Sequence, residues 1–149
     1  MLNRRALIAG AAAASAPAPA LAFLRPPVTV YKTASCTCCQ GWINAMIRSG
    51  FYPQVKVVED LTPLNKRYGV PFQLSSCHLA SAGSYVLVGH VPPRDVMLLL
   101  RMRPKALGLT VPGMPLGSPG METPDGRKEA FATLLLLPGG KTRVFAQHG

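Results

Sequence analysis

The chain has 149 residues, and 16 Lys and Arg against 6 Asp and Glu give it a formal net charge of +10 at pH 7. This length fits a single domain with a hydrophobic core. The basic residues are dispersed and form no Lys/Arg run, which argues against a nucleic-acid-binding protein. The charge instead predicts a basic, soluble surface, with an acidic partner or an anionic membrane surface as alternatives.

Residues 1–22 predict an export signal. Arg4-Arg5 precedes an uncharged run over residues 6–16, and the small-residue site Ala20-Leu21-Ala22 follows. The arginine pair also resembles a twin-arginine signal, with an ordinary Sec signal as the alternative. Cleavage after this site would leave residues 23–149 as one exported domain. No later segment of the sequence is long and apolar enough to be a transmembrane helix.

The first part of the predicted domain alternates strands and helices. A β-branched and aromatic run predicts a strand over 28–31, and residues 55–58 predict a second strand. Between them, apolar residues recur at helical spacing over 39–48, which predicts a helix. Thr62-Pro63 is typical of a helix start, so we expect a second helix that ends at Gly69.

The rest of the chain predicts two hairpins and one further helix. Gly83-Ser84 between two strand-like runs suits a tight hairpin turn, and Pro92-Pro93 is typical of a helix start. The predicted segments are strands 79–82 and 85–88, a helix over 94–103, a long irregular Gly- and Pro-rich segment over 108–126, and a C-terminal hairpin from 130–137 and 142–146.

The order of these elements is that of a thioredoxin-like α/β domain with an extra C-terminal β-hairpin. We therefore expect a central mixed sheet with flanking helices. The first two strands are expected to be parallel and joined by a right-handed crossover. In that fold the loop after the first strand lies beside the start of the third strand. Residues 36–39 and the Cys77-His78 pair are therefore expected to face each other.

The cysteines form two short clusters. Cys36, Cys38 and Cys39 fall within four residues, and Cys77 directly precedes His78. Thiolates bind soft Cu(I) and borderline Zn(II). A helix N-terminus stabilises thiolates, because its N–H groups are unpaired and its dipole end is positive. The third thiol between a redox pair would invite wrong disulfides, so these five residues predict a metal site. Four thiolates exceed what one Cu(I) commonly needs, which allows bridging thiolates and more than one ion.

Three further residues are candidate ligands with ordinary alternatives. His90 is either a ligand or a hydrogen-bonded turn histidine. Met114 and Met121 lie in a Gly- and Pro-rich loop that could fold over the site, and a thioether is a Cu(I) ligand, although methionine more often serves in packing. His148 is expected to be free in the C-terminal tail. The residues expected in the core are Trp42, Met46, Met97 and Met102.

Four segments of the sequence form a recognisable set. They are residues 33–42 (Thr-Ala-Ser-Cys-Thr-Cys-Cys-Gln-Gly-Trp), Ser76-Cys77-His78, Gly89-His90-Val91-Pro92, and residues 111–122 (Val-Pro-Gly-Met-Pro-Leu-Gly-Ser-Pro-Gly-Met-Glu). In order and over nearly all of residues 23–149, this set resembles the exported CopG-type proteins of bacterial copper-resistance clusters. The resemblance implies a thioredoxin-like fold, a part in copper handling, and copper binding at Cys36, Cys38, Cys39 and Cys77. It does not imply whether the family is enzymatic.

These observations predict a periplasmic protein that sequesters or passes on Cu(I), with a change in copper oxidation state as a further role. Its expected partners are copper ions and other periplasmic copper-handling proteins. One alternative is a thiol-disulfide oxidoreductase that uses Cys36 and Cys39. Against it, Ser76 stands where a thioredoxin-like enzyme normally carries its cis-proline. Another alternative is a structural zinc site in an interaction module. An enzyme here would be a copper- or thiol-dependent oxidoreductase.

Overall fold

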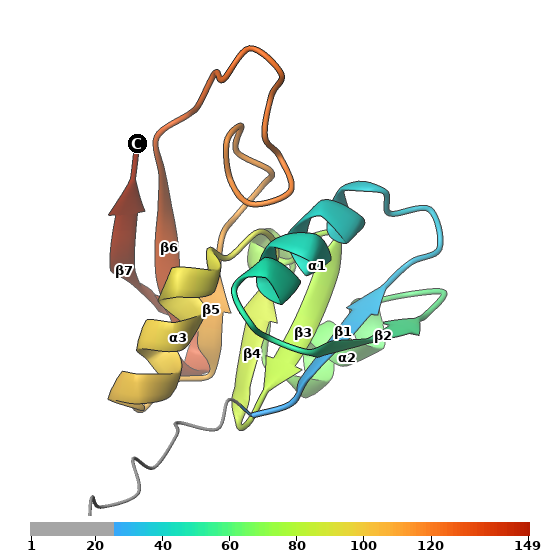
Figure 1. Ribbon diagram of the computed structural model, residues 1–149. Helices are drawn as coiled ribbons and strands as arrows, with labels where there is room; N and C mark the ends of the chain where they lie inside the picture. The colour runs from blue at the N-terminus through green and yellow to red at the C-terminus, as the bar shows by residue number, and fades with distance from the viewer. Residues whose placement is uncertain (1–25) are drawn as a thin grey trace, which may run out of the picture.

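The computed structural model describes residues 26–149, so the predicted signal over 1–22 lies outside the described residues. The elements in chain order are β1 (Val28–Lys32), α1 (Cys38–Arg48), β2 (Pro53–Val57), α2 (Thr62–Arg67), a 3₁₀ turn (Phe72–Leu74), β3 (His78–Ala82), β4 (Tyr85–Val88), α3 (Pro93–Met102), β5 (Gly108–Thr110), β6 (Phe131–Leu136), a second 3₁₀ turn (Pro138–Gly140) and β7 (Thr142–His148) (Figure 1).

The strands form one mixed seven-stranded sheet in the order β2-β1-β3-β4-β5-β6-β7. The β1–β2 and β4–β5 pairs are parallel, and all other neighbours are antiparallel. Each parallel pair is joined through a helix, α1 in the first case and α3 in the second. The α/β class, the mixed sheet with flanking helices and the C-terminal hairpin were predicted correctly.

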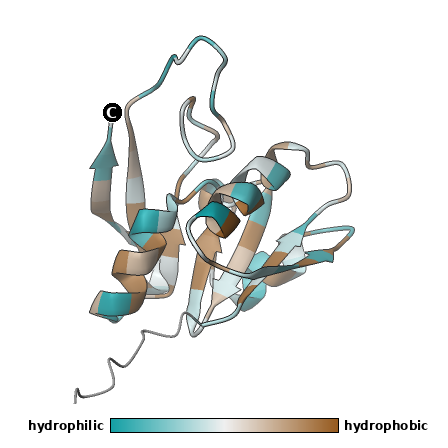
Figure 2. Ribbon diagram, in the orientation of Figure 1, coloured by the Kyte–Doolittle hydropathy of each residue, from teal (hydrophilic) through white to brown (hydrophobic). Residues whose placement is uncertain are grey.

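The two faces of the sheet carry separate cores. The larger core lies on the face covered by α1 and α3, and includes Trp42 and Leu99 from these helices with Leu87 from β4. The smaller core lies on the other face, where Leu79 of β3 packs with Val70, a residue of the segment that follows α2. Alternate residues of β3 and β4 enter opposite cores, which explains their almost unbroken apolar runs (Figure 2).

α1 and α3 are held on the sheet by apolar residues spaced three and four apart. The buried positions of α1 are Cys39, Trp42, Ile43, Ala45 and Met46, and those of α3 are Asp95, Val96, Leu99 and Leu100. Trp42 and Met46 are core residues as predicted, and Met97 packs against the core. Met102 does not, because it lies on the outer side of α3 and is 61% exposed.

The segment over 108–126 is not irregular throughout, which corrects the prediction from the sequence. Its first three residues form β5, which joins β4 to β6 and makes the sheet continuous. Gly108 is required there, because a Cβ atom would overlap the carbonyl oxygen of Val86. A three-residue strand that begins with glycine has too little pattern to be predicted. None of the helices within residues 26–149 is long and apolar enough to cross a membrane.

Candidate metal centre

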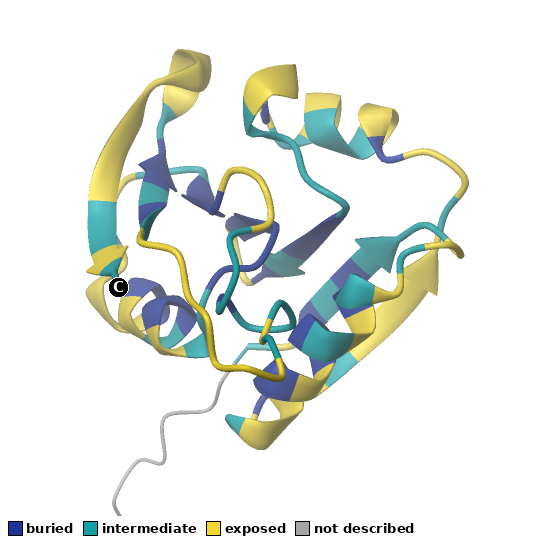
Figure 3. Ribbon diagram, turned by 90° about the horizontal axis from the view of Figure 1, so that it is seen from above, coloured by how far each residue is buried: buried dark blue, intermediate teal, exposed yellow. Residues whose placement is uncertain are grey.

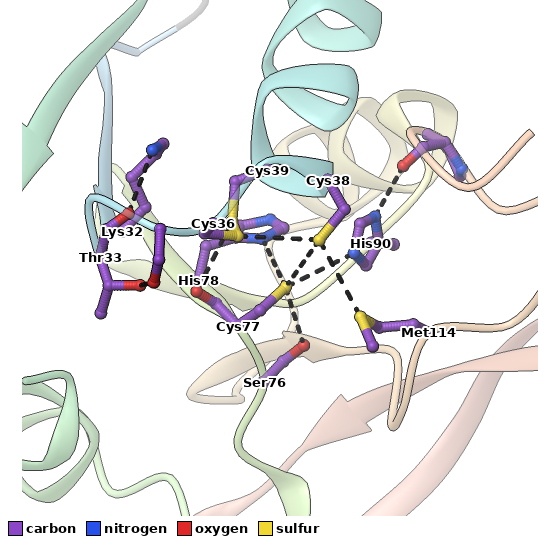
Figure 4. Close-up of a disulfide and its surroundings, with 12 residues drawn as sticks. Lys32, Thr33, Cys36, Cys38, Cys39, Ser76, Cys77, His78, His90 and Met114 are labelled. Carbon is purple, nitrogen blue, oxygen red and sulfur yellow. Dashed lines mark hydrogen bonds between the residues drawn. A yellow bond between two sulfur atoms is a disulfide. The ribbon is translucent and has the colours of Figure 1, made fainter.

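The two cysteine clusters meet where β1 ends and β3 begins. Lys32, the last residue of β1, pairs with His78, the first residue of β3, so Cys77 lies beside the loop that leads into α1. That loop and the first turn of α1 carry the other three cysteines. The four Sγ atoms all lie within 4.8 Å of one another (Figure 4).

The four cysteines differ in their bonding. Cys36 and Cys39 form a disulfide, whereas Cys38 and Cys77 are free thiols. The Sγ atom of Cys38 lies 3.7 Å from that of Cys36 and 3.6 Å from that of Cys77. The disulfide withholds two of the four candidate thiolate ligands, so all four become available only after its reduction.

Two imidazoles extend the cluster on the side of Cys77. The Sγ atom of this residue lies 3.5 Å from Nδ1 of His78 and 3.6 Å from Nε2 of His90, and ligand atoms of the three residues lie within 4.8 Å of one another. Both histidines are fully buried. Cys77 therefore belongs to both groups, one of four sulfurs and one of a sulfur with two imidazoles.

The tautomer of His90 follows from its hydrogen bond. Its Nδ1 lies 2.8 Å from the carbonyl oxygen of Pro119, which can only accept, so Nδ1 carries the proton. In the neutral ring Nε2 then has a free lone pair, and it lies 3.6 Å from the Cys77 sulfur, as in histidines that bind a metal. His90 is thus buried and hydrogen-bonded, as in the turn-histidine alternative, and its other ring nitrogen faces the centre.

His78 has an unused nitrogen. Among the described residues, its Nε2 is the one buried side-chain nitrogen or oxygen without a hydrogen-bond partner. Buried polar groups nearly always have a partner, so an exception marks a functional candidate. Trp42 supports this ring from beneath, with ring centroids 4.6 Å apart, and its Nε1 donates to the Val91 carbonyl at 2.8 Å.

The Gly- and Pro-rich loop after β5 reaches the centre, because Met114 contacts Cys38 and Pro119 contacts His90. In the view from above, the chain after β5 passes in front of the sheet (Figure 3). Met114 is about half exposed, and its Sδ lies 3.9 Å from the Cys38 Sγ. Met121 is bonded within the loop through its backbone, from its N–H to Ser118 and from Gly117 to its carbonyl, each at 2.8 Å. Met114 thus lies at the mouth of the centre, while no sulfur contact brings Met121 to the cysteines within the part of the chain described.

Two glycines let this loop dock on α1. A Cβ atom on Gly41 would lie 2.7 Å from the Cα of Gly120, and a Cβ on Gly120 would lie 2.5 Å from the backbone nitrogen of Trp42. Gly120 also has a φ of +90°, which side chains other than hydrogen rarely allow. The close backbone contact places Pro119 where it accepts the hydrogen bond of His90.

Comparison with known proteins identifies the family of the chain. A family model described as "Protein of unknown function, DUF411" matches residues 74–121, and no curated protein sequence matches significantly. A solved structure titled "Copper resistance protein copG- Form 1" is 36% identical, with a TM-score of 0.78, and the match covers 84% of this chain and 98% of that chain. The chain belongs to the CopG family.

A second CopG structure, titled "Form 2", gives nearly the same result. It is 37% identical with a TM-score of 0.77, and the match covers 83% of this chain and 99% of that chain. The resemblance inferred from the four sequence segments is therefore confirmed. The fold of residues 26–149 is that of the CopG structures over almost their full length.

Burial shifts two groups of this CopG centre in opposite ways. It raises the pKa of the Cys77 thiol to about 11, and the hydrogen bond with Cys38 adds to this, while Ser76 opposes it. Burial also lowers the pKa of His78 to about 3, and the nearby His90 adds to this effect. At neutral pH Cys77 is a thiol and His78 is neutral. Binding a metal must displace a proton from Cys77 but none from His78, so metal affinity should rise with pH.

The low pKa of His78 predicts an acid-sensitive fold. Below pH 6.5 the unfolded histidine takes up a proton, whereas the folded one does so only near pH 3. The unfolded state thus binds more protons, and the unfolding free energy of the metal-free protein should fall as pH drops from 6.5 towards 3, by up to about 1.4 kcal/mol per unit. Urea unfolding of wild type and His78→Gln at several pH values measures this, and equal slopes would contradict it.

The histidine near the C-terminus, predicted to be free, is bonded. His148 Nε2 lies 2.9 Å from an Asp95 carboxylate oxygen, and Thr133 donates to the same oxygen at 2.6 Å. These contacts tie the first turn of α3 to β6 and β7. Because β7 extends to His148, the residue belongs to a strand rather than a tail. The partners are 53 residues apart, and no sequence pattern joins them.

Proposed function

We propose that this CopG family member is a periplasmic copper-binding protein of copper resistance, which holds Cu(I) through Cys36, Cys38, Cys39, Cys77 and His78. The observation that carries the proposal is the gathering of four Sγ atoms within 4.8 Å. Thiolate is the ligand that soft Cu(I) prefers. The two similar structures are both titled as copper resistance proteins, and this supports copper as the metal.

The donor set favours copper over zinc. A structural zinc site is commonly closed and tetrahedral, with four Cys or His ligands. Here Met114, a thioether, lies beside Cys38 at the exposed side of the centre, and thioethers suit Cu(I) rather than Zn(II). Cys77 belongs to both donor groups, which supports a bridging thiolate and more than one ion. His90 is a further candidate ligand beside His78. Met121 is the candidate with the least support, because no contact within residues 26–149 brings its sulfur to the cysteines.

The remaining parts of the proposal concern export and fold. Residues 1–22 act as an export signal for the twin-arginine or the Sec route, and residues 23–149 form a thioredoxin-like metal-binding domain in the periplasm. Support for the fold comes from the β1–α1–β2 crossover, with β3 antiparallel to β1 and the cysteines at the start of α1. The partners are copper ions and other copper-handling proteins of that compartment.

Competition between metals tests this function directly. Protein purified without oxygen and with all thiols reduced should take Cu(I) from a chelator of known affinity, and excess Zn(II) should not displace it. A variant with all four cysteines changed to serine is the control, because it lacks the sulfur ligands and leaves all other side chains of the fold unchanged. Cu(I) binding no tighter than in this control, or a preference for Zn(II), would defeat the proposal.

The disulfide supports one second candidate, a thiol-disulfide oxidoreductase. Cys36 and Cys39 form this bond at the start of α1, where a helix N-terminus favours the attacking thiolate. The neighbouring sulfurs oppose this role. Cys38, 3.7 Å from Cys36, can attack the same bond and divert the reaction into non-productive disulfides.

An insulin-reduction assay separates the two functions. We expect little reductase activity from the copper-loaded protein, because metal-bound thiolates are no longer free nucleophiles, and modest activity from the metal-free form. Thioredoxin provides the reference rate. Turnover by the loaded protein at that rate, and lost in Cys36→Ser, would establish the oxidoreductase instead.

A further inference from the structure

The outer face of α3 carries apolar and basic residues together. Leu98 and Met102 are 42% and 61% exposed, although the helix has a well-packed inner face. Arg94 and Arg101 are exposed on the same outer side, because positions three and four apart in a helix are neighbours. Figure 1 shows α3 in front of the sheet, with no other helix or strand of residues 26–149 over the side of α3 that faces away from the sheet.

The charge on this face has no acidic counterpart in the structure. Arg103 and Lys105 follow α3 directly and are exposed. Within residues 26–149 the ion pairs are Arg127–Asp125 and His148–Asp95, so no acid of this range pairs with the cations of the face. Asp95, the acidic residue of α3, is buried, and its carboxylate is hydrogen-bonded to Thr133 and His148. We call the set Arg94, Leu98, Arg101, Met102, Arg103 and Lys105 the basic apolar face.

Arg103 has an unusual backbone. Its φ of +49° makes it the only residue other than glycine with a positive φ in residues 26–149. Glycine or asparagine normally ends a helix in this conformation, because other side chains are strained there. Arg103 also lines a cavity of about 340 Å³ together with Leu100, Tyr85 and Pro26.

The C-terminal part of the basic apolar face, at Arg103, lies at the end of the domain from which the predicted leader extends, whereas Arg94 lies in the first turn of α3. Pro26 lines the same cavity as Arg103, and the chain before it leads within residues 17–25 to the uncharged run over 6–16. That connecting stretch can span at most about 30 Å. Before cleavage, a leader in the membrane would therefore keep the Arg103 end of this face within about 30 Å of the lipid. The cysteines lie at the other end of β1.

We propose that the basic apolar face docks this protein on an anionic membrane surface. The arginines meet lipid phosphates, and the Leu98 and Met102 side chains enter the boundary between headgroups and acyl chains. Such mixed basic and apolar helix faces bind anionic bilayers peripherally and in a salt-dependent way. The proposal does not depend on copper binding.

Vesicle flotation tests the docking. The exported, processed protein should float with vesicles of about 30% phosphatidylglycerol in phosphatidylcholine at low salt, and should not float with pure phosphatidylcholine. Each cation near an anionic surface contributes about fivefold to the partition coefficient, so Arg101→Gln with Arg103→Asn should lower it about 30-fold. Asparagine suits the positive φ of Arg103, so this variant should keep the fold.

A matched pair of substitutions controls for net charge. Lys141→Gln with Arg143→Gln removes two exposed cations from β7 and the turn before it, and should lower binding much less. Leu98→Gln with Met102→Gln keeps every charge and should still weaken binding. An equal loss in the β7 control would overturn the proposal, since charge alone would then explain it. Failure of the wild type to float with anionic vesicles would also overturn it.

Discussion

Replacing Cys77 by serine is expected to weaken Cu(I) binding by at least about 100-fold, because even the partners of metal ligands commonly contribute 10- to 100-fold. The reason is its position, since its sulfur belongs both to the four-sulfur group and to the group with His78 and His90. Chelator competition under anaerobic, reducing conditions measures the affinity. Cys36→Ser should be about as damaging, although the two residues lie in separate parts of the sequence.

The double variant makes this prediction sharper. Two ligands of one centre give non-additive losses, so Cys36→Ser with Cys77→Ser should lose less than the sum of the single effects. Ser76→Ala is the matched neighbour of Cys77 and should have a small effect, because its hydroxyl only contacts the sulfur at 3.8 Å. If Cys77→Ser keeps full copper stoichiometry and affinity, β3 contributes no ligand and the proposed centre is wrong.

Replacing Gly120 by alanine is expected to destabilise the fold by about 3 kcal/mol and to weaken copper binding, because overpacking and strain at positive φ add together. The new Cβ would lie 2.5 Å from the Trp42 nitrogen and 3.0 Å from the Cys38 carbonyl oxygen, and these backbone atoms cannot move aside cheaply. The displaced loop would also take away the carbonyl of Pro119 that orients His90.

Gly126 provides the control within the same loop. It also has a positive φ, +73°, but a Cβ atom at this position would have open space within 4 Å. Gly126→Ala therefore carries the backbone strain alone, about 1 kcal/mol, and should leave copper affinity unchanged. Thermal unfolding and chelator competition on both variants measure the two effects. Equal destabilisation by the two substitutions would show that the loop is not docked on α1.

The sequence predicted the fold where its patterns were long. Helical spacing over 39–48 located α1, and the Pro92-Pro93 pair located the start of α3. The alternation of strands and helices predicted the mixed α/β sheet. β5 was missed because three residues beginning with Gly108 show no periodicity. The bonded His148 was missed because the contact with Asp95 depends on where β7 lies relative to the first turn of α3.

The candidate site was predicted in part for similar reasons. The cysteine clusters stand out in the sequence, and the expected element order placed them face to face. The orientation of His90 could not be predicted, because it depends on a loop carbonyl 29 residues away. Nor could the unequal positions of Met114 and Met121, since both occupy the same kind of Pro-Gly-Met context. The disulfide joins Cys36 and Cys39, the two residues named in the oxidoreductase alternative.

Copper K-edge X-ray absorption of the reduced, copper-loaded protein tests the central claim most directly. A centre of four cysteines with His78 predicts an edge typical of Cu(I) and a shell of neighbours dominated by sulfur, with a smaller nitrogen contribution. That sulfur contribution should decrease in Cys77→Ser. A shell dominated by nitrogen or oxygen, or a spectrum that is the same when all four cysteines are serine, would contradict the proposed copper centre.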